Sequence, residues 1–191
     1  MYFSKIVSTG SYLPEKIISN DDLSKVVDTN DEWIVSRSGI GNRRFSHDEN
    51  TSRLAANAAR NILGKINKSP EEVDLIIVAS VSADYITPSV ACLVQAEIGA
   101  VNAVAFDVNA ACTGFVFALS TADKFIKSGV YRNALVIGAE VLSKYLDFND
   151  RSTCVLFGDG AAGVFIERSE EETGLIAEIL GSDGAKGMSL T

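Results

Sequence analysis

The segment 103–127 constrains the fold most, because it passes from an apolar strand directly into a long amphipathic helix. We predict the strand over residues 104–108, and apolar residues at helical spacing begin at Phe115. The residues between these two elements are all small, and Cys112 lies among them. A sharp strand-to-helix turn needs small residues if it is to present one side chain at its apex. We therefore expect the rest of the chain to position this turn.

Two interpretations of Cys112 are open at this point. A thiol at the start of a helix lies in the positive field of the helix N-terminus, which favours the nucleophilic thiolate. Free cysteine is also common as a small buried hydrophobic side chain. Position in the sequence alone does not decide between a catalytic nucleophile and a residue of the core.

The composition excludes several classes of protein. The chain has 191 residues, of which 47% are hydrophobic and 22% charged, and this is ample for one domain with a buried sheet. Its net charge of −8 argues against non-specific binding to nucleic acid or to an anionic membrane surface. No apolar run approaches membrane-spanning length, and the N-terminal segment is too short and too polar for a signal peptide. The three cysteines lack a C-x-x-C pair, so we expect reduced thiols in a cytoplasmic protein and no metal site.

Strands alternate with helices along the chain, which predicts an α/β fold with a mainly parallel sheet covered on both faces. The clearest strand is the continuous apolar run 74–80, expected at the centre of the sheet, and a helix is predicted over 89–98. Further strands are predicted at 3–8, 134–139, 153–157, 162–167 and 175–180, and further helices from a capping box at Ser19 through Val27, within 28–41, and from a cap at Thr51.

Residues 158–163 match the pattern G-x-G-x-x-G of dinucleotide-binding proteins. That pattern binds pyrophosphate only where a helix follows it, and here the strand-like sequence VFIE follows. We therefore reject a dinucleotide site. The pattern favours a tight β turn whose glycines allow positive φ and close backbone approach.

The single histidine, His47, lies in a polar loop far from Cys112 in sequence. A catalytic Cys–His pair requires both groups within hydrogen-bond reach. We expect His47 to be solvated, so the chain offers a nucleophile without a convincing base.

Trp33, Arg37 and Arg151 suggest a different kind of site. A planar aromatic ring and a guanidinium group can stack on a flat ligand such as a nucleotide base. The alternative is a tryptophan that covers the edge of the core and an Arg151 that pairs with Asp147 or Asp150. The sequence pattern leaves both open.

Five segments together resemble the N-terminal half of the β-ketoacyl-acyl-carrier-protein synthase III family, one of the thiolase-like condensing enzymes. They stand in the family's order and spacing and cover nearly the whole chain. The resemblance implies a thiolase-like layered α/β/α half, the first of two pseudo-repeated halves, with residues 1–170 as its core domain and 171–191 as the start of the connection to the second half. The segments are DTNDEWIVSRSGI (28–40), PSVACLVQAEIGA (88–100), FDVNAACTGFVFAL (106–119), NDRSTCVLFGDGAAG (149–163) and GSDG (181–184).

The resemblance implies an acyltransferase that starts fatty-acid synthesis. An acyl-CoA, acetyl-CoA in the commonest case, would acylate Cys112. Malonyl-acyl-carrier protein would then be decarboxylated, and its carbanion would attack the thioester to give a β-ketoacyl product. Acyl-CoA is thus a substrate, with no permanently bound cofactor. The resemblance further implies a homodimer formed through the strand 104–108.

The same resemblance assigns binding residues. Trp33 and Arg151 would sandwich the adenine of CoA, with Thr29 and Arg37 nearby, and the backbone N–H of Cys112 would serve the oxyanion hole. Leu142 and Phe157 would line the acyl pocket. Position 87 is Thr, where several relatives place a bulky Phe that plugs the partner subunit's pocket, so we expect longer or branched primers.

The family's Cys works with a His and an Asn from the second half, and neither matches a position in this chain. We therefore expect a fragment that is inactive alone, that acylates Cys112 slowly at most, and that self-associates through bared apolar surface. A basic docking patch for the acidic carrier protein is expected mostly in the second half, with Arg37, Arg43 and Arg44 as local exceptions.

Rival interpretations remain from the sequence. One is another thiolase-like acyltransferase, such as a polyketide starter enzyme or a relative of 3-hydroxy-3-methylglutaryl-CoA synthase. Another is a truncated protein that binds CoA or acts as a scaffold without catalysis. A cysteine hydrolase is disfavoured because no partnering histidine is present.

Overall fold

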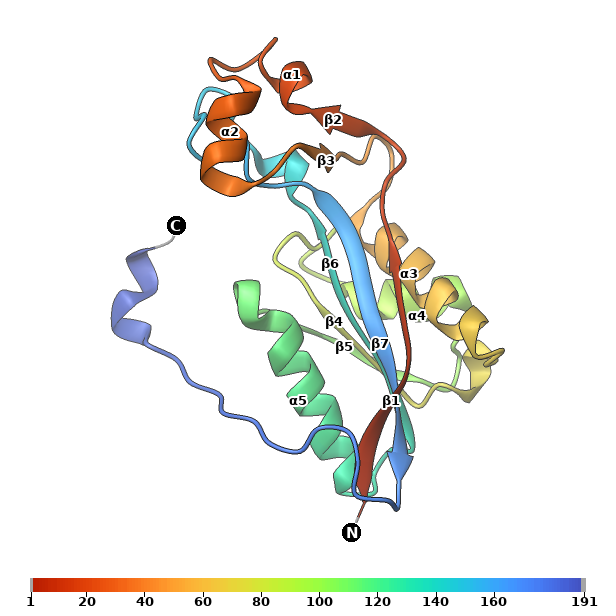
Figure 1. The fold of residues 1–191 in the computed structure, drawn as a ribbon. Helices are drawn as coiled ribbons and strands as arrows, with labels where there is room; N and C mark the ends of the chain where they lie inside the picture. Colours follow the sequence, from red (N-terminus) through yellow and green to blue (C-terminus); the bar gives the residue numbers. More distant parts are fainter. Residues whose placement is uncertain (1, 190–191) are drawn as a thin grey trace.

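The computed structural model describes residues 2–189, and a five-stranded sheet forms its centre (Figure 1). The strands lie in the order β1–β7–β6–β4–β5. β4 pairs in parallel with β5 and β6, whereas β7 runs antiparallel between β6 and β1, so every strand but β7 points the same way. This confirms the predicted α/β class and the mainly parallel sheet. The bounds are Phe3–Tyr12 for β1, Leu75–Ala79 for β4, Val104–Val108 for β5, Asn133–Val141 for β6 and Asp159–Ser169 for β7.

Helices cover both faces of this sheet, as predicted. α3 (Thr51–Lys65) and α4 (Val90–Ile98) lie on one face, and α5 (Gly114–Lys127) lies on the other (Figure 1). Side chains alternate across a strand, so β4 sends Ile76 and Val78 into the core under α3 and α4, and Leu75 and Ile77 into the core under α5. Both sets are fully buried, which explains the continuous apolar run.

A smaller unit, which we call the cap, lies beyond one end of the sheet and comprises residues 17–44 (Figure 1). It contains the antiparallel pair β2 (Ile17–Ser19) and β3 (Asn42–Arg44) and the helices α1 (Asn20–Leu23) and α2 (Asp31–Ser38). Its apolar centre joins cap side chains to the later turn at 154–155; the buried members are Leu23, Val27, Ile34, Cys154 and Val155.

The predicted helix signals in the cap are largely confirmed. Ser19 Oγ accepts the N–H of Asp22 at 3.0 Å, and the Asp22 carboxylate accepts the N–H of Ser19 at 3.1 Å. This is the predicted capping box, although the α-helix ends at Leu23 rather than near Val27. α2 begins after the cap residue Asn30 and stops at Gly39, whose φ of 73° is left-handed, as the glycine signal predicts.

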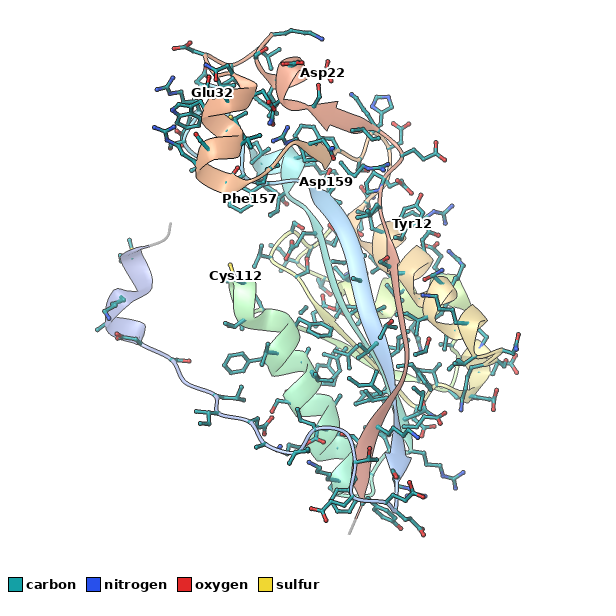
Figure 2. The ribbon with its side chains drawn as sticks, viewed as in Figure 1. Tyr12, Asp22, Glu32, Cys112, Phe157 and Asp159 are labelled. Carbon is teal, nitrogen blue, oxygen red and sulfur yellow. The ribbon has the colours of Figure 1, made fainter. Side chains whose placement is uncertain are left out.

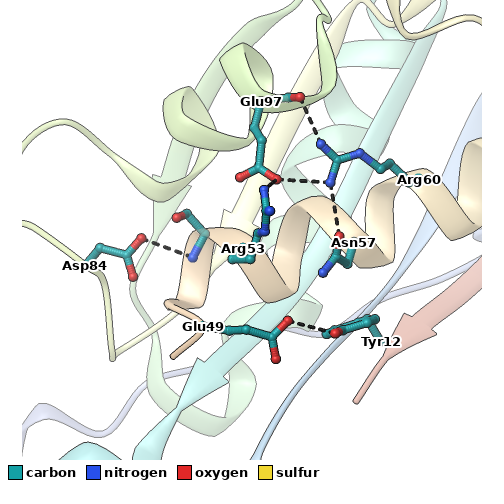
Figure 3. Close-up of polar contacts among 8 residues, drawn as sticks. Tyr12, Glu49, Arg53, Asn57, Arg60, Asp84 and Glu97 are labelled. Atoms are coloured by element: carbon teal, nitrogen blue, oxygen red, sulfur yellow. Dashed lines mark hydrogen bonds and ion pairs between the residues drawn. The ribbon is translucent and has the colours of Figure 1, made fainter. Parts of the chain in front are cut away.

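The start of α3 corrects the prediction that Thr51 is its cap. Thr51 is the first helical residue, and the cap position belongs to Asn50, whose side chain makes no capping hydrogen bond. Asp84 takes over that role from the loop after β4, because its carboxylate accepts the N–H groups of Thr51 at 2.8 Å and Ser52 at 3.1 Å. Figure 3 shows Asp84 at this helix end, and it also shows the polar contacts by which Arg53 and Arg60 of α3 hold Glu97 of α4.

The predicted strand 153–157 is wrong, because residues 153–156 form turns and Phe157 is irregular. The Asp150 carboxylate accepts the N–H and the hydroxyl of Ser152 at 2.9 and 2.5 Å and the hydroxyl of Thr153 at 2.6 Å. Such local hydrogen bonds compete with the extended conformation.

The predicted β turn at 158–163 is also wrong. β7 already begins at Asp159, and the glycines with positive φ within residues 2–189 lie elsewhere. Close backbone approach is confirmed, since a Cβ atom at Gly163 would lie 2.3 Å from the carbonyl oxygen of Val136. The strand that follows this pattern confirms the rejection of a dinucleotide site.

The segment after β7 does not form the strand predicted at 175–180. It passes alongside α5 (Figure 1), where Lys127 Nζ donates to the carbonyl of Leu175 at 3.0 Å and Lys124 pairs with Glu178. These contacts hold the chain extended without a partner strand. Apolar side chains such as Ile176 and Ile179 are almost fully exposed there.

A 3₁₀ segment of six residues, Gly184–Ser189, follows, and residues 190–191 of the predicted connection 171–191 lie outside the described residues. Within residues 2–189, no helix has the length and apolar character needed to cross a bilayer.

Candidate functional site

The loops that carry the predicted site residues meet at one edge of the sheet. Because β4, β5 and β6 are parallel, their carboxyl ends lie at the same edge. The loop 80–89 follows β4, the turn with Cys112 follows β5, and a 3₁₀ turn, Leu142–Tyr145, follows β6. β7 is antiparallel and therefore starts at this edge, where Asp159 pairs with Val141. Ligand sites of open α/β sheets lie outside the carboxyl ends of the strands, so this edge is the place to look for chemistry.

Cys112 occupies the predicted strand-to-helix turn. Residues Ala111–Thr113 form one 3₁₀ turn that leads into α5, and Gly114 packs so closely on Ala79 that an added Cβ would lie 3.2 Å away. The thiol is exposed, and Figure 2 shows its sulfur at the end of α5 that faces the cap. The alternative of a buried, purely hydrophobic Cys112 is therefore wrong.

The backbone around Cys112 is both strained and open. Ala111 has a φ of +46°, a left-handed value that costs a non-glycine residue on the order of 1 kcal/mol and is concentrated at functional sites. Thr113 N–H donates to the carbonyl of Ala110 at 3.2 Å, and Gly114 N–H donates to that of Ala111. Within residues 2–189, the N–H of Cys112 has no such partner. A free backbone donor beside the thiol is what an oxyanion hole requires.

Trp33, Arg37 and Arg151 form one cluster, although they come from α2 and from the distant turn before β7. The guanidinium carbons of Arg37 and Arg151 lie 4.5 and 5.0 Å from the centre of the Trp33 ring. Arg151 donates to the carbonyl of Asp28 at 3.0 Å and lies 3.7 Å from its carboxylate, so the predicted alternative of pairing with Asp147 or Asp150 is wrong. Trp33 also packs against the apolar centre of the cap, so this part of the alternative is correct.

The spacing in this cluster has a consequence for any flat ligand. A planar base between Trp33 and Arg151 needs two stacking contacts of roughly 3.5 Å each, more than the present separation of 5.0 Å. Arg151 would have to swing away from Asp28, which is open to solvent. Thr29, just before α2, carries a buried hydroxyl with no hydrogen-bond partner within residues 2–189, an uncommon state for a buried polar atom.

The three predicted acyl-pocket residues lie at the same edge as Cys112. Leu142 is half-buried and comes directly after β6, whereas Phe157 is 39% exposed and comes two residues before β7. Since Val141 pairs with Asp159, the two side chains leave neighbouring strand ends. Thr87 is exposed in the loop after β4, beside the exposed Tyr85 and Ile86.

Arg43 corrects part of the expectation of a local docking patch. Arg43 is 7% exposed and donates to the carbonyls of Ile18 (3.2 Å) and Val155 (3.1 Å) and to Asn20 Oδ1 (2.8 Å). Burial lowers the pKa of Arg43. Arg44 donates to the carbonyls of Pro14 and Glu15. Arg43 is therefore an internal strut of the cap and not a docking residue, whereas Arg37 is exposed.

His47 confirms the expectation of a solvated loop residue, because its side chain is 82% exposed. The sequence pattern marks neither Arg43 as a structural residue nor Asp159 as part of the site. The signal for Asp159 was weak: one acidic residue within a run of small residues at the start of a strand.

Comparison with known proteins gives one consistent result. A profile of the 3-oxoacyl-[acyl-carrier-protein (ACP)] synthase III family, 3-oxoacyl being another term for β-ketoacyl, matches residues 106–184. A β-ketoacyl-[acyl-carrier-protein] synthase III of Clostridium acetobutylicum is 62% identical over 180 residues, which are 94% of this chain and 55% of the relative.

The similar solved structures include a synthase III and a polyketide enzyme. The 3-oxoacyl-[acyl-carrier-protein] synthase III of Aquifex aeolicus is 53% identical with a TM-score of 0.86, over 88% of this chain and 55% of that one. A priming β-ketosynthase from a polyketide biosynthetic pathway is 36% identical with a TM-score of 0.85, over 88% of this chain and 51% of that one. The chain spans somewhat more than half the length of the relatives it matches.

Proposed function

Because this chain belongs to the β-ketoacyl-[acyl-carrier-protein] synthase III family, we propose that it carries the acyl-accepting site of an acyltransferase that starts fatty-acid synthesis. The substrates are an acyl-CoA primer and malonyl-acyl-carrier protein. The observation that carries the proposal is the exposed thiol of Cys112 on a strained turn, beside a free backbone N–H, at the carboxyl edge of the sheet.

The first half-reaction uses groups of this chain. The Cys112 sulfur attacks the carbonyl of the acyl-CoA thioester, and the Cys112 N–H stabilises the negative charge that forms on the carbonyl oxygen. The carbon–sulfur bond to CoA then breaks, so CoA leaves as a thiolate and the acyl group stays on Cys112. Cys112 attacks as the thiolate, whose negative charge is stabilised by the positive end of the α5 helix dipole.

The second half-reaction needs groups from outside residues 1–191. Malonyl-acyl-carrier protein loses CO₂, and the resulting carbanion attacks the acyl carbon on Cys112, which releases the sulfur as thiolate. In the family a His and an Asn stabilise the enolate form of the carbanion. His47 does not supply this function, because it is exposed in a loop beside Asp48. We therefore propose that the 191-residue chain acylates slowly and does not condense.

The Trp33 cluster is the proposed CoA site. The adenine stacks between Trp33 and Arg151 once the Arg151 guanidinium has moved away from the ring, and Arg37 adds positive charge. The hydroxyl of Thr29, which is buried and has no hydrogen-bond partner within residues 2–189, is proposed to donate to the nucleotide after it turns out of its buried position. No permanently bound cofactor is part of this proposal, since CoA enters and leaves as substrate and product.

Leu142 and Phe157 are the proposed walls of the acyl pocket, and Thr87 is proposed to face the pocket of a partner subunit. β5 is the edge strand of the sheet, which suits pairing with a second copy across residues 104–108. Thr87 fills less space than Phe, so we propose a primer longer than acetyl or branched. The acidic carrier protein is proposed to dock mainly outside this chain, whose net charge is −8.

The likeness to the priming β-ketosynthase supports a second candidate, a polyketide starter enzyme with the same first half-reaction. The two candidates differ in the carrier protein whose malonyl group attacks the acyl thioester on Cys112. We also propose a cytoplasmic location, because three widely spaced cysteines without a C-x-x-C pair favour reduced thiols.

The proposal is tested by incubating the chain with acetyl-CoA and longer or branched acyl-CoAs, followed by intact-mass measurement. We expect one acyl group per chain, lost in the Cys112→Ala variant and kept in Cys154→Ala, whose thiol is buried. Malonyl-acyl-carrier protein is then added, and we expect no β-ketoacyl product. Acylation that survives Cys112→Ala would contradict the proposed nucleophile, and condensation at an enzymatic rate would contradict the proposed need for outside groups.

A further inference from the structure

One buried carboxylate ties together three segments at the edge of the sheet where Cys112 lies. Asp159 is 6% exposed and opens β7. Its Oδ1 accepts the N–H of Ser143 at 2.8 Å, and its Oδ2 accepts the hydroxyl of Ser143 at 2.6 Å and the N–H of Ser46 at 2.7 Å. The segments joined are therefore the start of β7, the 3₁₀ turn after β6 and the loop after β3.

Asp159 has a close relation to both proposed walls of the acyl pocket. Ser143 directly follows Leu142, and Phe157 lies two residues before Asp159. The strand ladder fixes the register only as far as the pair Val141–Asp159. Beyond this pair the chain after β6 forms a 3₁₀ turn and the chain before β7 is not a strand. The Asp159 carboxylate links these two segments past the end of the ladder. Figure 2 shows Phe157 and Asp159 on the cap side of the sheet, toward which Cys112 points.

The residues just before Asp159 are also held in place. A Cβ at Gly158 would lie 3.0 Å from Cβ of Arg43 and 3.1 Å from the carbonyl oxygen of Arg44, so this residue packs directly on β3. Arg43 in turn holds the carbonyl of Val155. Phe157 therefore sits between two fixed points, and the Leu142 turn depends on the carboxylate for its position relative to Phe157.

We propose that Asp159 is a positioning residue that sets the length of the acyl primer accepted at Cys112; this rests on the proposed function. Asp159 touches neither the thiol nor the acyl chain in this account. It holds the Leu142 turn against the segment that carries Phe157, and this fixes the depth of the pocket between them. One methylene group changes the reaction rate by only about 10- to 200-fold, even in a rigid pocket. A pocket whose walls can move would adapt to the extra methylene and lose this difference between primers.

The main test is the variant Asp159→Asn in the 191-residue chain. Asn has the shape of Asp, but an NH₂ group replaces one of the two accepting oxygens. This NH₂ group cannot accept a hydrogen bond from the Ser143 and Ser46 donors that face the Asp159 carboxylate. We measure the rates of Cys112 acylation by acetyl-, butyryl- and hexanoyl-CoA by intact mass. The ratio between the best and the poorest primer is expected to fall by roughly tenfold.

A matched control is Asp74→Asn. Asp74 accepts the N–H of Arg132 at 2.8 Å at the opposite end of β4 and β6, far along the strands from Cys112. The Asp74→Asn variant loses a hydrogen bond of the same type, from a backbone N–H to a carboxylate. Its ratio of acylation rates between the best and the poorest primer is expected to stay that of the wild type. Ser143→Ala, which removes only the hydroxyl bond to Asp159, is expected to lower the ratio in the same direction by a smaller factor, and it serves if Asp159→Asn does not fold.

Hydrogen exchange of backbone amides separates positioning from general structural support. Faster exchange in residues 142–146 and 155–158 of Asp159→Asn, together with a lowered primer ratio, supports the proposal. Faster exchange with an unchanged ratio would overturn it, because Asp159 would then be structural only. If the wild-type chain is not acylated at Cys112 by any primer, the proposed function fails and this inference falls with it; acylation with equal ratios in all variants refutes the inference alone.

Discussion

Arg43 offers the sharpest test of how the cap is held in place. The variant Arg43→Met keeps an unbranched apolar stem but removes all three hydrogen bonds to Ile18, Asn20 and Val155. Hydrogen bonds to a charged group contribute about 1.5 kcal/mol or more each, so the expected loss from the three bonds is at least about 4.5 kcal/mol. Domains of this kind have about 5–15 kcal/mol of stability, so a loss of this size would release the cap before the sheet.

The chain contains its own reporter for this event, since its single tryptophan, Trp33, lies in the cap. Urea unfolding is followed by Trp33 fluorescence and by far-UV circular dichroism, which reports mainly the sheet and the helices around it. In Arg43→Met the fluorescence transition is expected at clearly lower urea than the circular dichroism transition. The control Arg44→Met loses two bonds that water can replace, because the Arg44 side chain is only half-buried. Both transitions are therefore expected to shift by about 1 kcal/mol or less. Equal shifts in the two variants would refute the strut role of Arg43.

Three further predictions concern other parts of the molecule. Arg151→Ala is expected to weaken CoA binding about fivefold, as measured by calorimetry, because about 1 kcal/mol of stacking is lost. The stability of the chain should change little, because the ion pair that Arg151 forms with the fully exposed Asp28 contributes little. Unchanged affinity would contradict the CoA site. Burial alone would raise the pKa of Asp123, but hydrogen bonds from Ser4, Lys127 and Lys124 outweigh it and hold the pKa below its ordinary value. The charged carboxylate of Asp123 therefore stabilises the folded state at pH values above its unfolded pKa of about 3.9, and this stabilisation is lost as the pH falls through its folded-state pKa. In urea unfolding, Asp123→Asn should have a lower free energy of unfolding than the wild type at pH 7, and the difference should be smaller near pH 3. An equal difference at both pH values would refute this. Gly163→Ala is expected to lower the free energy of unfolding by about 3 kcal/mol, because β7 packs closely on β6 at this position. Gly64→Ala should raise it by about 0.5–1 kcal/mol, because Gly64 lies in α3 with open space around it. Similar effects of the two substitutions would contradict the close packing of β7 on β6.

Local patterns sufficed for the central elements. The run 74–80 predicted a buried central strand because both faces of β4 are covered, and the small residues around Cys112 predicted the turn that presents it. Caps at Ser19 and Asn30 and the stop at Gly39 act within one helical turn, so they too are visible in sequence. Where a local polar side chain competed, as Asp150 does over 152–153, the apolar pattern predicted a strand that does not form.

Contacts between distant residues were not accessible in the same way. Arg43 binds Val155 and Asp159 binds Ser46, and each pair is separated by more than 100 residues. Arg43 stands in a polar part of the sequence and there looks like a surface charge, which is why it was expected in a docking patch. The cluster of Trp33 and Arg151 was foreseen only as one of two alternatives, and the family resemblance supplied the pairing.

The most direct test of the central claim compares two exposed thiols of the same chain. Cys112 lies on the turn before α5, whereas Cys92 is exposed on α4 and donates weakly to the carbonyl of Ala105. After incubation with acyl-CoA, peptide-resolved mass spectrometry measures the acylated fraction of each over time. Selective acylation of Cys112 is the predicted result. Equal acylation of both thiols, or none at Cys112, would contradict its assignment as the acyl-accepting nucleophile.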